Sequence, residues 1–145
     1  MIYTLTFNPA IDYVMHFDAI DTGKTNRSEN EYAVIGGKGI NVSVVLARLG
    51  VPSVAMGFVA GFTGEAIKNE LEGMGIKTDF VQLKKGLSRI NVKVKTETET
   101  ELNGKGPEIS DVELSCLFEK LDGLKENDTL VLAGSIPKSL PKDIF

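Results

Sequence analysis

The chain has 145 residues, of which 42% are hydrophobic and 25% charged, a composition typical of one globular domain. Its 20 acidic side chains outnumber 16 basic ones, and the net charge of −4 argues against nucleic acid or an anionic membrane as the main partner. No apolar run approaches the roughly 18 residues of a membrane-spanning helix. The first residues do not resemble a secretory signal, and the single cysteine, Cys116, cannot form an internal disulfide. We therefore expect a cytoplasmic protein.

The first fifty residues predict two strands, a loop and a helix. Residues 2–7 are rich in β-forming side chains, and residues 11–17 alternate between two faces. Residues 18–31 are polar, as in a loop. The sequence GGKG at 36–39 then leads into a helix predicted over 41–49. The apolar stripe of that helix is Val42, Val45, Leu46 and Leu49.

The next segment predicts a strand, a helix and a second strand. Residues 53–59 and 78–83 are apolar runs of strand length. Between them we expect a helix that is capped by Thr63 and continues to Met74, with Gly75 as its stop. The inward side chains of this helix are predicted to be Ile67, Leu71 and Met74.

Residues 88–102 have a different pattern. Polar side chains at 89, 91, 93 and 95 alternate strictly with apolar ones at 90, 92 and 94, and a second polar strand follows. This pattern predicts a hairpin with one wet face, which does not fit a sheet buried on both sides. We assign the hairpin and residues 11–17 to a small separate β layer.

The last third of the chain predicts one more helix and one more strand. Ser110 and Glu113 form a capping box at the start of the helix, and residues 128–133 read as a buried strand. Strands that alternate with helices predict a parallel sheet covered on both faces, in an α/β fold. Residues 140–145 resemble the first turn of a further helix, with Pro141 near its start. We therefore expect this chain to be the front part of a longer protein.

Polar side chains from distant segments point to one binding site. Lys38 lies beside a predicted helix N-terminus, where free amides attract anions or ligand hydroxyls. Asp12 can accept hydrogen bonds from hydroxyl groups, and Arg89 can bind a phosphate through parallel bonds. With Asn41 and Asn91 they suit a phosphorylated polyol. Taken singly, each is also compatible with an ordinary surface or turn residue.

Other familiar site patterns are absent or incomplete. Gly23-Lys24-Thr25 resembles the end of a Walker A loop, but Asp18 stands where the first glycine belongs. The glycine stretch is not GxGxxG, so it is not a dinucleotide fingerprint. His16 is the only histidine, which excludes a histidine-rich metal site.

A family resemblance extends over the whole chain. It is carried by MIYTLTFNPAID, GGKGINVSVVLARLG, GFVAGFTGE, SRINVK, GPEIS and LVLAGSIPKSLP, which in this order resemble the PfkB (ribokinase-like) sugar kinases. The resemblance implies a ribokinase-like three-layer α/β/α fold with a mostly parallel sheet and a small β-sheet lid. Residues 1–145 would form the N-terminal part of one kinase domain, with lid segments at about 11–17 and 88–102.

The resemblance also implies a reaction. Within the family, this sequence most resembles the branch that acts on phosphorylated hexoses. The resemblance implies a kinase that uses ATP and Mg²⁺ to phosphorylate fructose 1-phosphate at its 6-hydroxyl. A tagatose 6-phosphate kinase and a non-catalytic sugar-phosphate-binding module stay open as alternatives. Residue by residue, the resemblance implies sugar-hydroxyl contacts from Asp12, Gly36, Gly37 and Asn41. It implies phosphate contacts from Lys38 and Arg89, with Lys24 or Arg27 reaching in, and a contact from Ser135 near the transfer site.

The sequence departs from the family pattern at two points, and its predicted lid has apolar faces. Val44 stands where many relatives carry arginine, and the family's GAGD element with its catalytic aspartate does not occur in this chain. The resemblance therefore implies that the catalytic aspartate and most of the ATP pocket lie outside it, and that the isolated chain is inactive. The predicted lid has apolar faces at Tyr13, Met15, Phe17, Ile90, Val92 and Val94. We expect them to pair lids in a homodimer; burial against the chain's own core is the alternative.

Overall fold

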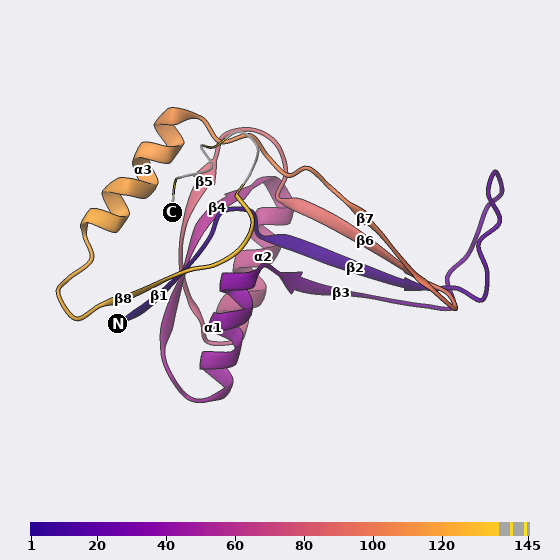
Figure 1. The fold of residues 1–145 in the computed structure, drawn as a ribbon, viewed down its shortest axis with the longest axis horizontal. Helices are drawn as coiled ribbons and strands as arrows, with labels where there is room; N and C mark the ends of the chain where they lie inside the picture. The colour runs from indigo at the N-terminus through magenta and orange to yellow at the C-terminus, as the bar shows by residue number, and fades with distance from the viewer. Residues whose placement is uncertain (137–139, 141–143, 145) are drawn as a thin grey trace.

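The computed structural model describes residues 1–136, 140 and 144. In chain order the elements are β1 (Ile2–Thr6), β2 (Ala10–His16), β3 (Asn30–Gly36), α1 (Lys38–Arg48), β4 (Ser53–Ala60), α2 (Gly61–Gly73), β5 (Lys77–Leu83), β6 (Arg89–Lys95), β7 (Glu99–Asn103), α3 (Asp111–Asp122) and β8 (Thr129–Leu132). The strands form two four-stranded sheets, which we call sheet A and sheet B. Figure 1 shows sheet B extending away from the helices as a long arm.

Sheet A is the parallel sheet that the alternation of strands and helices predicts. Its strand order is β5-β4-β1-β8, and every pair in it is parallel. Strand β4 is buried on both faces: Met56 and Phe58 join the core under α3, whereas Ala55 joins the core under α1 and α2. Figure 1 shows α3 on one side of sheet A and the other two helices on the opposite side. The predicted three-layer α/β/α fold is thereby confirmed.

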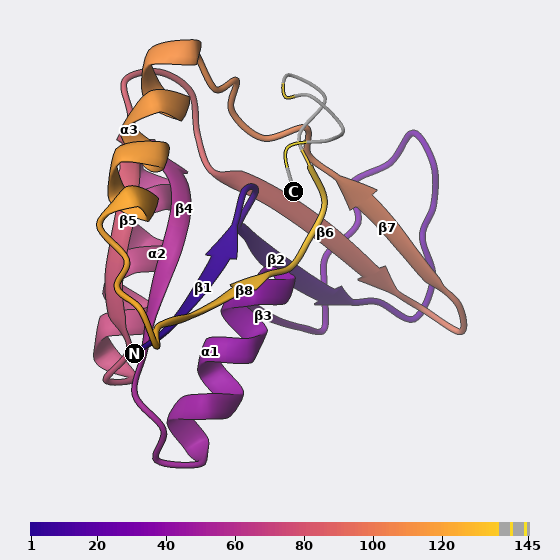
Figure 2. The same ribbon diagram turned by 60° about the vertical axis from the view of Figure 1, so that its left-hand side comes forward.

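Sheet B is the separate β layer that the alternating segments predict. Its order is β3-β2-β6-β7, with β2 parallel to β6 and the other pairs antiparallel. The β6–β7 hairpin, visible in Figure 2, confirms the prediction for residues 88–102. In register, Asp12 lies beside Asn91. Tyr13 lies beside Val92, and Val92 in turn lies beside Leu102 on β7. One face is therefore polar around Asp12, and the opposite face is apolar.

Strand β3 is an element that the sequence prediction missed. We placed residues 18–31 in a loop, yet β3 begins at Asn30 and pairs with β2 along its whole length. It is an edge strand, and its apolar side chains Tyr32 and Val34 are exposed. Because these residues do not alternate with polar ones, their strand state depends on pairing with β2 rather than on a local pattern.

Helix α1 begins earlier and buries another face than predicted. It starts at Lys38, and its fully buried residues are Gly39, Ile40 and Ser43. Val45 and Leu49 of the predicted stripe are 52% and 71% exposed, so that prediction is wrong. The reason is a polar contact: the Ser43 hydroxyl lies 2.7 Å from that of Thr4 on β1 and accepts from that of Ser53 at 3.0 Å. Hydroxyl groups can be buried when they hydrogen-bond to one another, so a polar residue can occupy the buried face of a helix. A search for apolar residues alone does not find such a face.

Helix α2 also differs from its prediction at the ends. It starts at Gly61, so Thr63 lies inside the helix and is not its N-cap. The buried Thr63 hydroxyl instead donates to the carbonyl of Ser88 at 2.9 Å, which ties α2 to the start of β6. Ile67 and Leu71 are fully buried as predicted, whereas Met74 is exposed beyond the last turn.

Helix α3 and the chain end complete the fold. The capping box of Ser110 and Glu113 is present, and Leu117 is fully buried against sheet A. The helical turn predicted around Pro141 lies outside the described residues. Within the part of the chain that the structure describes, no helix is long and apolar enough to cross a membrane.

Candidate sugar-phosphate site

A cavity of about 170 Å³ lies where sheets A and B meet. We call it the strand-end cavity, because β1 and β8 end at it, and open α/β sheets bind ligands at the carboxyl ends of their strands. It is lined by Thr6, Asn8, Ala10, Asp12, Gly37, Lys38, Asn41, Arg89, Asn91, Gly134 and Ser135. The structure thus brings together Asp12, Gly37, Lys38, Asn41, Arg89, Asn91 and Ser135 from the residues that the sequence singled out.

The glycine stretch lets the start of α1 press against the end of β1. Gly37 has a φ of +131°, and a side chain on Gly39 would lie 2.5 Å from the Thr6 hydroxyl oxygen. The same hydroxyl accepts a hydrogen bond from the amide of Ile40 at 3.1 Å. Only glycine permits this close approach. Its result is that Gly37, Lys38 and Asn41 present the positive end of a helix to the strand-end cavity.

Asp12 is held at the centre of the polar face of sheet B. Its Oδ1 accepts a hydrogen bond from Asn91 Nδ2 at 2.8 Å, and its Oδ2 lies 3.5 Å from Lys93 Nζ. Lys93 Nζ also lies 3.5 Å from Glu101 on β7. The Asp12 carboxylate raises the pKa of Lys93, burial opposes that rise, and Glu101 adds to it. Lys93 is therefore a charged partner of Asp12 over the physiological pH range.

Three residues that line the strand-end cavity each have a buried polar atom without a hydrogen-bond partner in the described structure. These atoms are Asn8 Oδ1, Arg89 Nε and Asn91 Oδ1. Leaving a buried donor or acceptor unpaired costs about 1–3 kcal/mol, so such atoms are rare in native proteins. Asn8 Oδ1 lies against Gly106, beside the loop that Asn8 Nδ2 contacts. Arg89 and Asn91 line the cavity together with Lys38 and Asp12, and a set of cations, an acid and an amide suits a ligand that carries hydroxyl groups and an anion.

Three predicted site residues do not line the strand-end cavity. Gly36 lies behind Asp12, where a side chain would come within 3.1 Å of Asp12 Oδ2, so its role is to leave room for the carboxylate. Lys24 and Arg27 lie in the β2–β3 loop, which Figure 1 shows at the far end of the arm. Lys24 forms an exposed ion pair with Asp21 at 3.0 Å.

Sequence reasoning missed Thr6, Asn8 and Lys93 as residues of this region. Asn8 follows β1 and donates through Nδ2 to the carbonyl of Lys105 at 3.2 Å, which joins two distant loops. Lys93 does not line the cavity, but it lies on the same predicted face as Arg89 and Asn91, and that shared face was the available signal.

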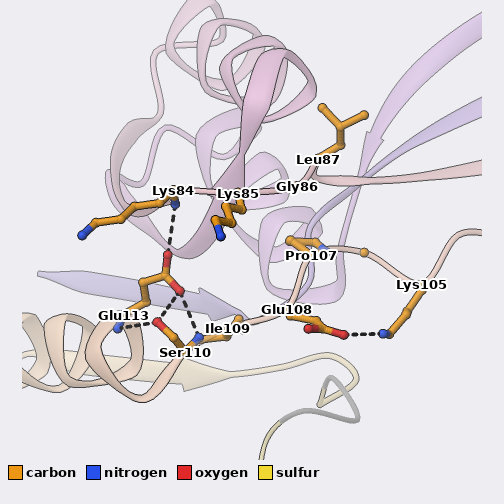
Figure 3. Close-up of a pocket in the computed structure, with 11 residues that line it drawn as sticks. Lys84, Lys85, Gly86, Leu87, Lys105, Pro107, Glu108, Ile109, Ser110 and Glu113 are labelled. Carbon is orange, nitrogen blue, oxygen red and sulfur yellow. Dashed lines mark hydrogen bonds and ion pairs between the residues drawn. The ribbon is translucent and has the colours of Figure 1, made fainter.

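A larger hollow of about 640 Å³ lies between the β5–β6 and β7–α3 connections (Figure 3). Its carboxylates already have partners: Glu113 accepts from the amide of Lys84 at 3.0 Å and from Ser110, and Glu108 pairs with Lys105 at 2.7 Å. Asn8 Oδ1 lies against Gly106 of this hollow, but the three residues with unpaired buried atoms line the strand-end cavity and not this one. The strand-end cavity is therefore the better candidate site despite its smaller volume.

No cluster of metal-binding side chains is present in the described part of the chain. Among the described residues, no group of three or more histidine, cysteine or acidic side chains could hold a metal. Cys116 is exposed on α3.

The family assignment rests on the whole length of the chain. The family model described as "pfkB family carbohydrate kinase" matches residues 5–145 of this chain. The chain belongs to the PfkB family. This confirms the resemblance inferred from the sequence motifs, and the PfkB assignment fits a two-sheet architecture with a polar cavity between the sheets.

Named relatives give a more detailed comparison. The chain is 51% identical to a 1-phosphofructokinase from Bacillus subtilis and 39% identical to a D-tagatose-1-phosphate kinase from Bacillus licheniformis, covering 100% of this chain in both and 48% and 47% of those proteins. A solved structure of phosphofructokinase-2 from Escherichia coli in complex with fructose-6-phosphate is 27% identical, with a TM-score of 0.86 over 97% of this chain and 47% of that one. The chain thus spans about half the length of the relatives it matches.

Proposed function

We propose that this chain carries the sugar-phosphate-binding part of an ATP- and Mg²⁺-dependent kinase that phosphorylates fructose 1-phosphate at its 6-hydroxyl. The observation that carries the proposal is one cavity whose lining joins the cations Lys38 and Arg89 to the acid Asp12, with Arg89 Nε buried and without a partner in the described structure. The name of the Bacillus subtilis relative supports the choice of fructose 1-phosphate.

Each residue has a defined task in this proposal. Arg89 and Lys38 bind the phosphate that the sugar already carries, since both are cations at the cavity wall. Asp12 and Asn41 bind sugar hydroxyls, and the Asp12 carboxylate is already oriented by Asn91. Ser135, which follows β8, contacts the sugar close to the hydroxyl that is phosphorylated. These residues bind and orient the acceptor, which is a large part of catalysis in phosphoryl transfer.

We further propose that the 145 residues alone do not catalyse the reaction. The sequence lacks the GAGD element, and the described residues contain no metal-ligand group. ATP and Mg²⁺ bind to other parts of the complete kinase, and these supply the charge stabilisation at the transferred phosphoryl group.

A coupled assay of ADP release from the complete protein tests the proposal. We expect the highest kcat/KM with fructose 1-phosphate, and lower values with tagatose 1-phosphate, tagatose 6-phosphate and fructose 6-phosphate. A preference for tagatose 1-phosphate would favour the activity named for the Bacillus licheniformis relative. Activity with none of these sugars would contradict the kinase proposal and favour a non-catalytic binding module.

A further inference from the structure

We propose that Lys93 is a positioning residue for Asp12, and that it offsets the charge of this acid so that the strand-end cavity accepts a phosphorylated sugar. The inference rests on the proposed function and adds a residue to which neither the family resemblance nor the cavity lining gives a role. Lys93 does not line the strand-end cavity, so it acts through Asp12 rather than on the ligand.

The geometry of sheet B places Lys93 one pleat beyond Asp12. In register, Lys93 lies beside Val14 on β2 and opposite Glu101 on β7, on the face that carries Asp12. Its ammonium lies 3.5 Å from both Asp12 Oδ2 and Glu101 Oε1, and its side chain is only 27% exposed. The ammonium group therefore bridges the edge of the hairpin and the acid of the cavity.

This contact completes the restraint of the Asp12 carboxylate. Asn91 holds Oδ1, Lys93 holds Oδ2, and the bare backbone of Gly36 faces the carboxylate from the third side. A carboxylate has about four acceptor positions, so two held contacts leave others for sugar hydroxyls. The Asp12 side chain is thus fixed before ligand binds, which lowers the entropy cost of binding.

The charge of Lys93 matters because the proposed ligand is an anion. An uncompensated Asp12 carboxylate would repel a sugar phosphate that binds to Arg89 and Lys38 in the same cavity. The Lys93 ammonium is charged at neutral pH and lies 3.5 Å from Asp12 Oδ2 and from Glu101 Oε1, so it offsets part of the negative charge of these two acids. Lys93 should therefore favour phosphorylated over unphosphorylated ketoses.

The same strand supplies a matched control. Lys95 lies on the same face of β6 as Lys93, and it pairs with Glu99 across the hairpin at 3.2 Å, as Lys93 pairs with Glu101. In register Lys95 lies beside His16, one pleat farther from Asp12. Lys93→Met and Lys95→Met therefore each remove one lysine–glutamate pair, but only the first removes a partner of Asp12.

The test compares these variants in the complete protein. We expect Lys93→Met to raise KM for fructose 1-phosphate on the order of tenfold, with little change in kcat, because one charge pair near the ligand is lost. Lys95→Met should leave KM within about twofold of wild type. Lys93→Arg should restore most of the loss, and affinity for unphosphorylated fructose, measured by calorimetry, should change less than affinity for fructose 1-phosphate.

Each outcome decides the inference. Equal KM values for Lys93→Met and Lys95→Met in an active enzyme would overturn the role of Lys93 and leave the proposed function intact. A wild-type protein without kinase activity would contradict the proposed function and this inference with it. In an Asp12→Asn background, Lys93→Met should cause no further rise in KM; an undiminished effect there would also overturn the inference, since the two residues would then act independently. Thermal unfolding of both lysine variants shows whether they fold equally well.

Discussion

At the scale of single residues, Arg89 gives a test in which affinity and stability respond differently. Its Nε is buried without a partner, so replacing the side chain removes a donor whose hydrogen bond is not made in the free protein. We expect Arg89→Met to keep or raise the melting temperature without ligand. KM for fructose 1-phosphate should rise about tenfold to a hundredfold, since a charged hydrogen bond contributes about 1.5–3 kcal/mol.

The control for this prediction is Arg48, which is exposed in the last turn of α1. Arg48→Met should leave both quantities near wild type. If Arg89→Met instead lowered the melting temperature strongly and left KM unchanged, Arg89 would be a structural residue and not a phosphate-binding one.

At the scale of elements, the start of α3 makes stability depend on pH. Burial raises the pKa of Glu113, but hydrogen bonds from Ser110 and from the amide of Lys84 outweigh it, and the net shift is downward. Because the folded pKa is lower than the unfolded one, Glu113 stabilises the fold above the ordinary value of 4.5, and this contribution is lost as pH falls through the folded value.

Urea unfolding of wild type and Glu113→Gln checks this dependence. We expect wild type to have the larger free energy of unfolding at pH 7, with a difference of up to about 1 kcal/mol that disappears as the solution is acidified. The control is Glu119→Gln, at an exposed acid on the same helix. Its free energy of unfolding should stay close to that of wild type throughout the same pH series. A Glu113→Gln difference that stays constant from neutral to acidic pH would contradict the account.

Some features of the helices and strands could be predicted from sequence patterns, and others could not. The β6–β7 hairpin and the polar face with Asp12, Arg89 and Asn91 could be predicted, because a period of two fixes which side chains share a face. The buried face of α1 could not, since the paired hydroxyls of Ser43 and Thr4 lie where the pattern predicts apolar contact. Long-range contacts of this kind leave no local signal.

Some residues of the candidate site could likewise be predicted from the sequence, and others could not. Asp12 and Arg89 were predicted from their chemistry and spacing, and the register of sheet B brings them to one cavity. Lys24 and Arg27 were expected only from the family resemblance, and in this chain their loop lies at the far end of the arm. Asn8 was missed because an asparagine before proline is also an ordinary turn residue.

At the scale of the whole molecule, the apolar face of sheet B leads us to propose a homodimer. This face carries Tyr13, Val92 and Leu102 side by side, and Leu102 is 59% exposed. Its base is covered by the chain's own core, where Ile11 and Ile35 pack against α1 and α2. An exposed apolar strip of this kind favours pairing with a second copy.

Light scattering on the complete protein at tens of micromolar checks this proposal. We expect the mass of a dimer, and we expect Leu102→Lys to shift it toward a monomer because a charge would be buried in the contact. Val112→Lys, at an exposed apolar position on α3, is the control. A monomeric wild type would show that the strip has no partner of its own kind.

The central claim is that the strand-end cavity binds the phosphorylated ketose. A crystal structure of the complete protein with fructose 1-phosphate bound tests it most directly. We expect the phosphate at Arg89 and Lys38 and a sugar hydroxyl on Asp12, with the buried Arg89 Nε and Asn91 Oδ1 now hydrogen-bonded. A sugar phosphate bound instead in the larger hollow at Lys84 and Lys85, with those two atoms still unpaired, would contradict the account.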